Sequence, residues 1–287
     1  MKIGGLLSQK RTLSFEVYPP KPDQPMAGLT ETLSHLYDLQ PDFISCTYGA
    51  GGGNRSRNLA VCEGIQAAGR TMVLSHYTCV GGTREDIRAQ MAAYRALGIE
   101  NILALRGDFP AGFAGTQGDF AHATDLLAFL KAEYPGFCFG AACYPETHAR
   151  AASPESDLAY LKEKQDMGAE FCIAQLCFDP AAFARFLDRA RNAGITLPVL
   201  AGVMPALNAQ RVLDMTAANG CTVPADLRAL IERYGGDAEA FRAAGVDYTA
   251  ALADRFLGLD VGGLHLYTMN GYRYVTKIVA QSCALLK

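Results

Sequence analysis

The carboxyl group of Glu16 is the first candidate for chemistry in this sequence, because it lies near the end of an alternating segment. Apolar Leu13, Phe15 and Val17 alternate with Ser14, Glu16 and Tyr18, which is the period of a β-strand with two different surroundings. Two prolines follow, and neither can donate to a strand ladder. An inward-facing carboxylate is unfavourable unless it is paired or used, and in a parallel barrel this strand end is where chemistry occurs. The structural alternative is a glutamate that caps a turn or pairs with a surface lysine.

Polar side chains also end five further predicted strands. They lie in Thr47-Tyr48-Gly49, Ser75 to Thr78, Arg106-Gly107-Asp108, Tyr144 to His148 and Gln175 to Asp179. Segments that begin with apolar residues become polar at the same end, which is typical of a ligand-binding mouth and not of a closed core. Each residue alone has a structural explanation, such as a core imidazole for His76, an Arg106–Asp108 pair or simple packing for Tyr144. Six polar strand ends together favour an active site.

These residues must be positioned by alternating strands and helices. The predicted strands span 13–18, 42–48, 71–78, 101–106, 137–144, 170–177, 197–203 and 263–269. Amphipathic helices are expected between several of them, at 84–97, 119–133, 154–167 and 180–193, with start signals at Thr83, Ser153 and Asp179. This pattern predicts an α/β fold, a single (β/α)₈ barrel domain over residues 1–287, with a doubly wound open sheet as the alternative. Extra helices are expected before the last strand, at 227–234 and 248–257.

Composition narrows the class of protein. The chain has 287 residues, half of them hydrophobic, and a net charge of -3, which gives no basic surface for nucleic acid. No signal-peptide pattern and no membrane-length apolar run is visible, so a cytoplasmic protein is predicted. The nine cysteines are expected to be reduced thiols, mostly in the core. No metal-ligand spacing is recognisable, so no metal site is expected.

Two familiar catalytic motifs are missing. The glycine-rich segment Gly49 to Asn54 lacks the last glycine of the dinucleotide-binding fingerprint, and no Gly-x-Ser-x-Gly elbow exists for acyl transfer. The glycine-rich segment is therefore expected to be a flexible loop.

At its strand ends the chain resembles the methylenetetrahydrofolate reductase family. The matching pieces, in order, are SFEVYPPKP, SCTYGAGG, SHYTC, ALRGD, AACYPETH, a helix from Asp157 to Lys164, AQLCFD, GVMP and LYTMN. They cover the chain from Leu13 to about Ala280. The resemblance implies a (β/α)₈ barrel in the short bacterial form, without the C-terminal regulatory domain of eukaryotic members.

The resemblance also implies FAD bound at the barrel mouth without a dinucleotide-binding fingerprint. Arg106, His148 and Lys164 are suited to neutralise a pyrophosphate. Asp157 and Lys164 lie two helical turns apart, so both can reach one ligand. The implied cofactor contacts are Thr47, Tyr48, His76, Arg106, Gly107, Asp108, Ala123, Tyr144, His148, Asp157 and Lys164.

The implied reaction converts 5,10-methylenetetrahydrofolate to 5-methyltetrahydrofolate with NADH or NADPH as donor. Glu16 would protonate N10 of the folate, which requires a raised pKa, and reduced FAD would deliver hydride to the resulting N5-iminium. Asp108 would stabilise the developing positive charge. Nicotinamide and folate would alternate in one pocket, with Thr47 and Gln175 touching the nicotinamide. Folate contacts are implied for Gln175, Arg211 and Met215, and a homo-oligomer is expected.

The chain departs from the family at three positions. Met215 replaces a frequent aromatic residue, Arg211 aligns with a glutamine that contacts folate in some members, and Gly271 replaces an arginine, with Arg273 two residues later. Two other functions stay open: a flavin-binding barrel subunit of an electron-transfer complex, and a flavin-free barrel lyase.

Overall fold

The structure is a computed structural model that describes residues 1–21, 23–48, 55–108 and 118–282. The glycine-rich segment from Gly49 to Asn54 lies outside the described residues.

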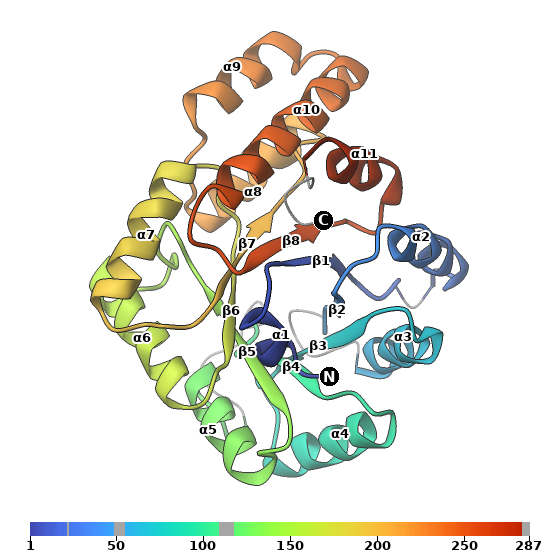
Figure 1. The fold of residues 1–287 in the computed structure, drawn as a ribbon, viewed down its shortest axis with the longest axis vertical. Coiled ribbons are helices and arrows are strands. Elements are labelled where there is room, and N and C mark those ends of the chain that lie inside the picture. The colour runs from blue at the N-terminus through green and yellow to red at the C-terminus, as the bar shows by residue number, and fades with distance from the viewer. Residues whose placement is uncertain (22, 49–54, 109–117, 283–287) are drawn as a thin grey trace.

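Eight parallel strands form a closed barrel in chain order, and the last strand pairs with the first (Figure 1). The predicted (β/α)₈ barrel is confirmed, and the open doubly wound sheet is wrong because β1 and β8 are hydrogen-bonded. The strands are β1 (Thr12–Val17), β2 (Phe43–Cys46), β3 (Met72–Thr78), β4 (Asn101–Leu105), β5 (Cys138–Cys143), β6 (Phe171–Ala174), β7 (Val199–Val203) and β8 (Gly263–Tyr267).

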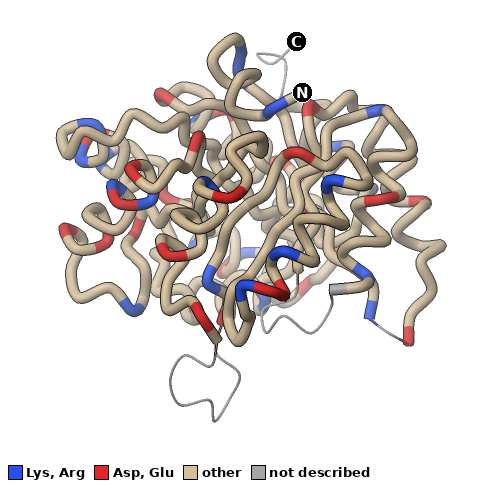
Figure 2. Tube along the Cα trace, turned by 90° about the horizontal axis from the view of Figure 1, so that it is seen from below, with Lys and Arg blue, Asp and Glu red and all other residues tan. Residues whose placement is uncertain are grey.

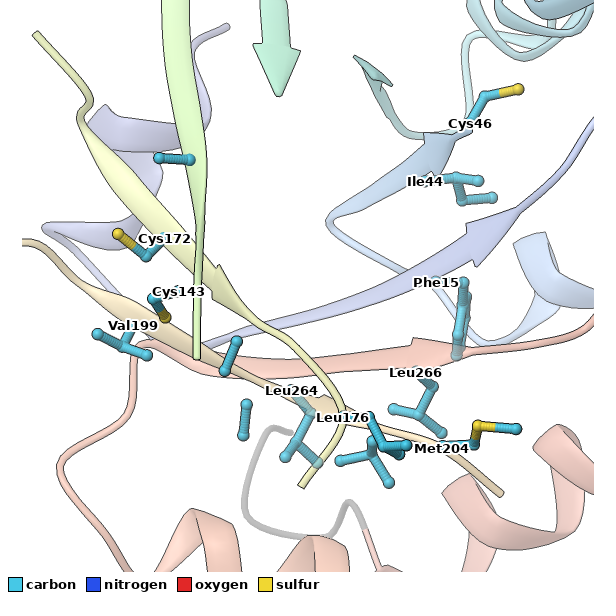
Figure 3. Packing of buried hydrophobic residues seen from close by; sticks show 14 of the residues in the cluster. Phe15, Ile44, Cys46, Cys143, Cys172, Leu176, Val199, Met204, Leu264 and Leu266 are labelled. Atoms are coloured by element: carbon cyan, nitrogen blue, oxygen red, sulfur yellow. The ribbon is translucent and has the colours of Figure 1, made fainter. Parts of the chain in front are cut away.

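The alternation in the first strand sorts its side chains as predicted. Leu13, Phe15 and Val17 belong to the apolar layer between the barrel and its helices. Figure 3 shows part of this layer, with Phe15 beside Ile44 and Leu266 from the two neighbouring strands. Burial of each large apolar side chain contributes about 1.5–3 kcal/mol, which fixes the register and turns Ser14 and Glu16 inward.

A second apolar cluster fills the opposite, N-terminal end of the barrel. It contains Phe43, Leu74 and Phe171 together with Ile3 and Leu7 from α1 (Ile3–Leu7). This short helix lies in the centre of the strand ring in Figure 1. The backbone N–H of Ile3 donates to the Asn101 side chain at 2.9 Å. The barrel is therefore closed below, and its polar residues face the C-terminal mouth.

Helices surround the barrel and several begin at the predicted caps. Thr83 accepts from the backbone N–H of Asp86, Ser153 from that of Ser156, and Asp179 from that of Ala181. The helices between consecutive strands are α2 (Ala27–Asp38), α3 (Arg55–Ala68), α4 (Arg84–Ala96), α5 (Ala123–Glu133), α6 (Pro154–Asp166) and α7 (Pro180–Asn192), and α11 (Tyr272–Ser282) follows β8.

The last crossover carries three helices, α8 (Ala209–Asn219), α9 (Ala225–Tyr234) and α10 (Ala238–Leu257). The expected start of the third helix at residue 248 is wrong, because the helix begins ten residues earlier at Ala238, where Asp237 caps it. Gly245 lies inside α10 because the helix passes close to the chain after β7. A Cβ at this position would lie 1.8 Å from the Ala206 carbonyl oxygen.

Basic and acidic residues are interspersed along the trace in the view of Figure 2. Within the described ranges, no helix has both the length and the apolar character that a membrane span requires. The described cysteines are all free thiols, as expected.

Candidate active site

The closed barrel brings the predicted strand-end residues to one rim, because the strands are parallel and their C-terminal ends coincide. Glu16 is the penultimate residue of β1, His76 lies in β3, and Gln175 directly follows β6. The backbone N–H of Thr47 donates to the Val17 carbonyl at 3.0 Å, which holds Thr47 beside the end of β1.

Glu16 lies between two histidines. Its Oε2 is 3.5 Å from Nε2 of His76 and 3.6 Å from Nε2 of His265. The Glu16 side chain keeps 21% of its surface exposed, whereas His265 is fully buried. The carboxyl group therefore contacts the two histidines on the side of the barrel interior and is accessible from the mouth.

His265 is held by β1 and β2. Its Nδ1 lies 2.8 Å from the Ser14 hydroxyl, which itself donates to the Leu264 carbonyl at 3.0 Å. The Ser14 hydroxyl therefore fixes the orientation of the imidazole ring. The other ring nitrogen faces Glu16 and the Ser45 hydroxyl, which is 3.3 Å away. Sequence reasoning missed His265, although a histidine that alternates with Leu264 and Leu266 was a usable signal.

The histidines decide the protonation of Glu16. Burial raises the pKa of Glu16, but the polar contact with His265 and the charges of His76 and His265 outweigh burial, so its pKa lies below the usual 4.5. These contacts oppose the raised pKa that a proton donor needs at neutral pH.

His76 should make stability depend on pH. Burial lowers its pKa from the usual 6.5 to about 4. Between these values the unfolded chain binds a proton that the folded chain does not, so the free energy of unfolding should fall as pH decreases from about 6.5 to about 4. Urea unfolding of His76→Asn across this range should give a flatter dependence than the wild type. The exposed His35→Asn is the control, and an unchanged slope in His76→Asn would contradict the assignment.

The Arg106-Gly107-Asp108 segment directly follows β4. Gly107 has φ of 87°, in the left-handed region that favours glycine. Arg106 is half-buried and Asp108 is exposed, on either side of this glycine.

One cluster of side chains lies beside this segment and consists of Tyr144, His148, Asp157 and Lys164. The backbone N–H of His148 donates to Asp157 Oδ2 at 2.9 Å, and the rings of Tyr144 and His148 meet edge to face at 4.6 Å. The Lys164 ammonium lies 5.7 Å from the Tyr144 ring centre and donates to the Ala142 carbonyl at 2.8 Å.

Burial and nearby charged groups shift the pKa values of two tyrosines in and near this cluster. Burial, with further contributions from Asp157 and Asp108, raises the pKa of Tyr144 to about 12. Burial and the charges of Glu16 and Tyr144 raise the pKa of Tyr267. Charged groups of β1 and of the segment after β4 therefore both act on tyrosines near this cluster.

The cluster suits an anionic cofactor. Within the described ranges Lys164 forms no ion pair with a carboxylate, and burial lowers its pKa from the usual 10.5. A phosphate oxygen would supply the counterion that this ammonium lacks, with Arg106 and His148 nearby. A cavity of about 10 Å³ lined by Tyr144, Asp157 and Lys164 holds no more than about one water molecule, so it is too small for a cofactor.

Other predicted contacts lie differently. The Tyr48 side chain is buried against Tyr77 in the layer outside the barrel, with ring centres 4.9 Å apart, so only its backbone is available to a ligand at the mouth. Ala123 is the first residue of α5. Arg211 and Met215 lie one turn apart on α8, where Arg211 is exposed and Met215 is half-buried.

The segment after β8 is hydrogen-bonded to the residue that follows β1. The Asn270 side chain accepts from the Tyr18 backbone N–H at 2.9 Å and donates to the Tyr18 carbonyl at 2.7 Å. The Arg273 guanidinium lies 6.0 Å from the Tyr272 ring centre at the start of α11.

Comparison with known proteins identifies the family of the chain. A sequence model of the methylenetetrahydrofolate reductase family matches residues 3–283. The chain belongs to this family. The 5,10-methylenetetrahydrofolate reductase of Escherichia coli is 33% identical over 261 residues, with 90% of this chain and 86% of that protein covered. The protein from Salmonella typhimurium is 34% identical with the same coverage.

Longer reductases also match. Methylenetetrahydrofolate reductase (NADH) 1 of Arabidopsis thaliana is 35% identical over 284 residues, which cover 94% of this chain but 48% of the plant protein. The chain therefore spans about half the length of its plant relatives. Among solved structures, an uncharacterised Clostridium thermocellum protein described as binding two copies of 5-methyl-5,6,7,8-tetrahydrofolic acid shares the fold, with a TM-score of 0.68, 13% identity and coverage of 96% and 95%.

Proposed function

We propose that this reductase-family chain reduces 5,10-methylenetetrahydrofolate to 5-methyltetrahydrofolate with electrons from NADH or NADPH, by way of FAD. The observation that carries the proposal is the partly exposed carboxyl group of Glu16 on the same rim as the cluster that contains Lys164. The chain matches the family model from residue 3 to 283.

FAD would be held by the cluster that follows β4 and β5. Arg106, His148 and Lys164 would face the pyrophosphate, and Asp157 would keep the His148 backbone in place through its 2.9 Å hydrogen bond. When bound, FAD supplies a two-electron carrier between nicotinamide and folate. His76 in β3 and Gly107 after β4 would also line the cofactor site.

Glu16 would donate the proton to N10 of the folate, which opens the five-membered ring to an N5-iminium. With its pKa below the usual 4.5, the carboxyl group is ionised at neutral pH in the absence of other contacts. A flavin and a pterin placed over the mouth would bury its exposed 21% and raise its pKa toward the value that a proton donor needs.

Asp108 and Gln175 would contact the substrate from the ends of β4 and β6. The Asp108 carboxylate would stabilise the positive charge that develops on the iminium. The Gln175 amide can donate and accept, as a pterin edge requires. Arg211 and Met215 on α8 would contact the rest of the folate. A homo-oligomer remains a prediction from the resemblance, and a cytoplasmic location remains a prediction from the sequence pattern.

A single mouth implies that nicotinamide and folate alternate. Initial rates at several fixed folate concentrations should then give parallel double-reciprocal lines, and intersecting lines would contradict alternation.

The purified protein tests the proposal directly. We expect a yellow protein whose flavin band is bleached by NADH or NADPH without oxygen and recovers when 5,10-methylenetetrahydrofolate is added. Colour that neither nicotinamide bleaches would favour a flavin-binding subunit with another electron donor. A colourless protein that cannot take up FAD would favour the flavin-free lyase.

A further inference from the structure

The phenol of Tyr267 reaches across one strand of the barrel to the next. Its hydroxyl donates to the Ala174 carbonyl at 2.9 Å. Tyr267 ends β8 and Ala174 ends β6, and β7 lies between these strands (Figure 1). The bond therefore joins two strands that are not neighbours in the sheet.

The sheet leaves a place for this bond. The paired register of β6 and β7 ends at Ile173 and Leu200, one step before Ala174. A carbonyl buried at this point needs a donor, and the phenol supplies one where the next rung of the ladder would lie.

Gly202 in β7 makes room for the phenol. A Cβ at Gly202 would lie 2.0 Å from the Ala174 carbonyl oxygen and 2.5 Å from the Tyr267 hydroxyl. Any side chain at this position would displace the bond, so the glycine and the tyrosine form one arrangement.

The peptide group between Ala174 and Gln175 is consequently held at both ends. Its carbonyl accepts from Tyr267, and its N–H, which belongs to Gln175, donates to the Cys143 carbonyl at 2.8 Å. The Gln175 side chain starts at this fixed peptide, so its direction follows from the Tyr267 contact.

Tyr267 also lies beside Glu16. The two residues are register partners on β8 and β1, and the Tyr267 ring meets the His265 ring edge to face at 5.7 Å. One side chain thus spans the distance from the carboxyl group to the strand that carries Gln175.

We propose that Tyr267 is a positioning residue for folate, which acts by fixing the peptide before Gln175. The inference rests on the proposed function, because Gln175 is assigned to folate there. Tyr267 touches neither reacting atom in this account, and its hydroxyl is committed to the Ala174 carbonyl.

Calorimetric titration of the FAD-loaded Tyr267→Phe variant with 5-methyltetrahydrofolate tests the inference. We expect the Kd for the folate to rise about tenfold, as for a buried carbonyl that loses its donor, while the content of bound FAD stays that of the wild type. Gly202→Ala should weaken folate binding in the same direction. Tyr248→Phe, on α10 outside the barrel, is the matched control and should bind folate normally.

A double-mutant cycle separates positioning from a general structural role. In a Gln175→Ala background, Tyr267→Phe should have no further effect on the folate Kd, because its route of action is gone. Unchanged folate binding in Tyr267→Phe, loss of bound FAD in that variant, or full additivity with Gln175→Ala would each overturn the inference. A wild-type protein that neither binds nor reduces folate would instead contradict the proposed function.

Discussion

Replacing Glu16 by glutamine should slow folate reduction by about 10²–10⁴-fold and leave flavin reduction by nicotinamide nearly intact. Glutamine has the shape of glutamate but cannot donate a proton to N10. The His76 and His265 contacts lie below the carboxyl group, so the variant should still fold and bind FAD. Stopped-flow absorbance of the two half-reactions measures both rates.

Glu170→Gln is a suitable control for this variant. Glu170 is half-buried like Glu16, but it precedes β6 at the closed end of the barrel and pairs with Lys131 at 3.3 Å. Unimpaired folate turnover in Glu16→Gln would remove Glu16 from the role of proton donor. Loss of flavin colour would show that the residue acts through cofactor binding.

Asp108→Asn should slow folate reduction by about 10²-fold more than flavin reduction, because a neutral amide no longer stabilises the cationic iminium. Asp108 is exposed at the mouth after Gly107, so its substitution should cost little stability. The same stopped-flow comparison applies, with the exposed Asp166→Asn at the end of α6 as control. An equal loss in both half-reactions would indicate damaged cofactor binding instead.

The fold was predictable because its signals are local and repeated. The alternation in Leu13 to Val17, the caps at Thr83 and Ser153, and the polar ends of successive strands each report on a few neighbouring residues. Burial of one face then fixes the register, and parallel strands bring all the polar ends to one rim.

The features that escaped prediction depend on long-range contacts. His265 gains its meaning from Ser14, which is 251 residues away in the chain. The five residues of α1 are too few for a helical period, yet they close the barrel from below. Tyr267 matters because the β6–β7 ladder stops one rung early, which no pattern within β8 reveals.

The direction of the Glu16 pKa shift could not be predicted from the sequence either. A carboxyl group turned into a barrel suggests a raised pKa, since burial disfavours charge. The structure adds two imidazoles that reverse the direction. The proposed proton donation therefore depends on what covers the mouth, not on the chain alone.

A crystal structure of the protein with FAD and 5-methyltetrahydrofolate would examine the geometry behind every rate predicted above. The account requires a pterin stacked over the mouth, with N10 of the folate within about 3.2 Å of the Glu16 carboxyl group or one bridging water away. A folate bound elsewhere, with Glu16 facing only its two histidines, would contradict it.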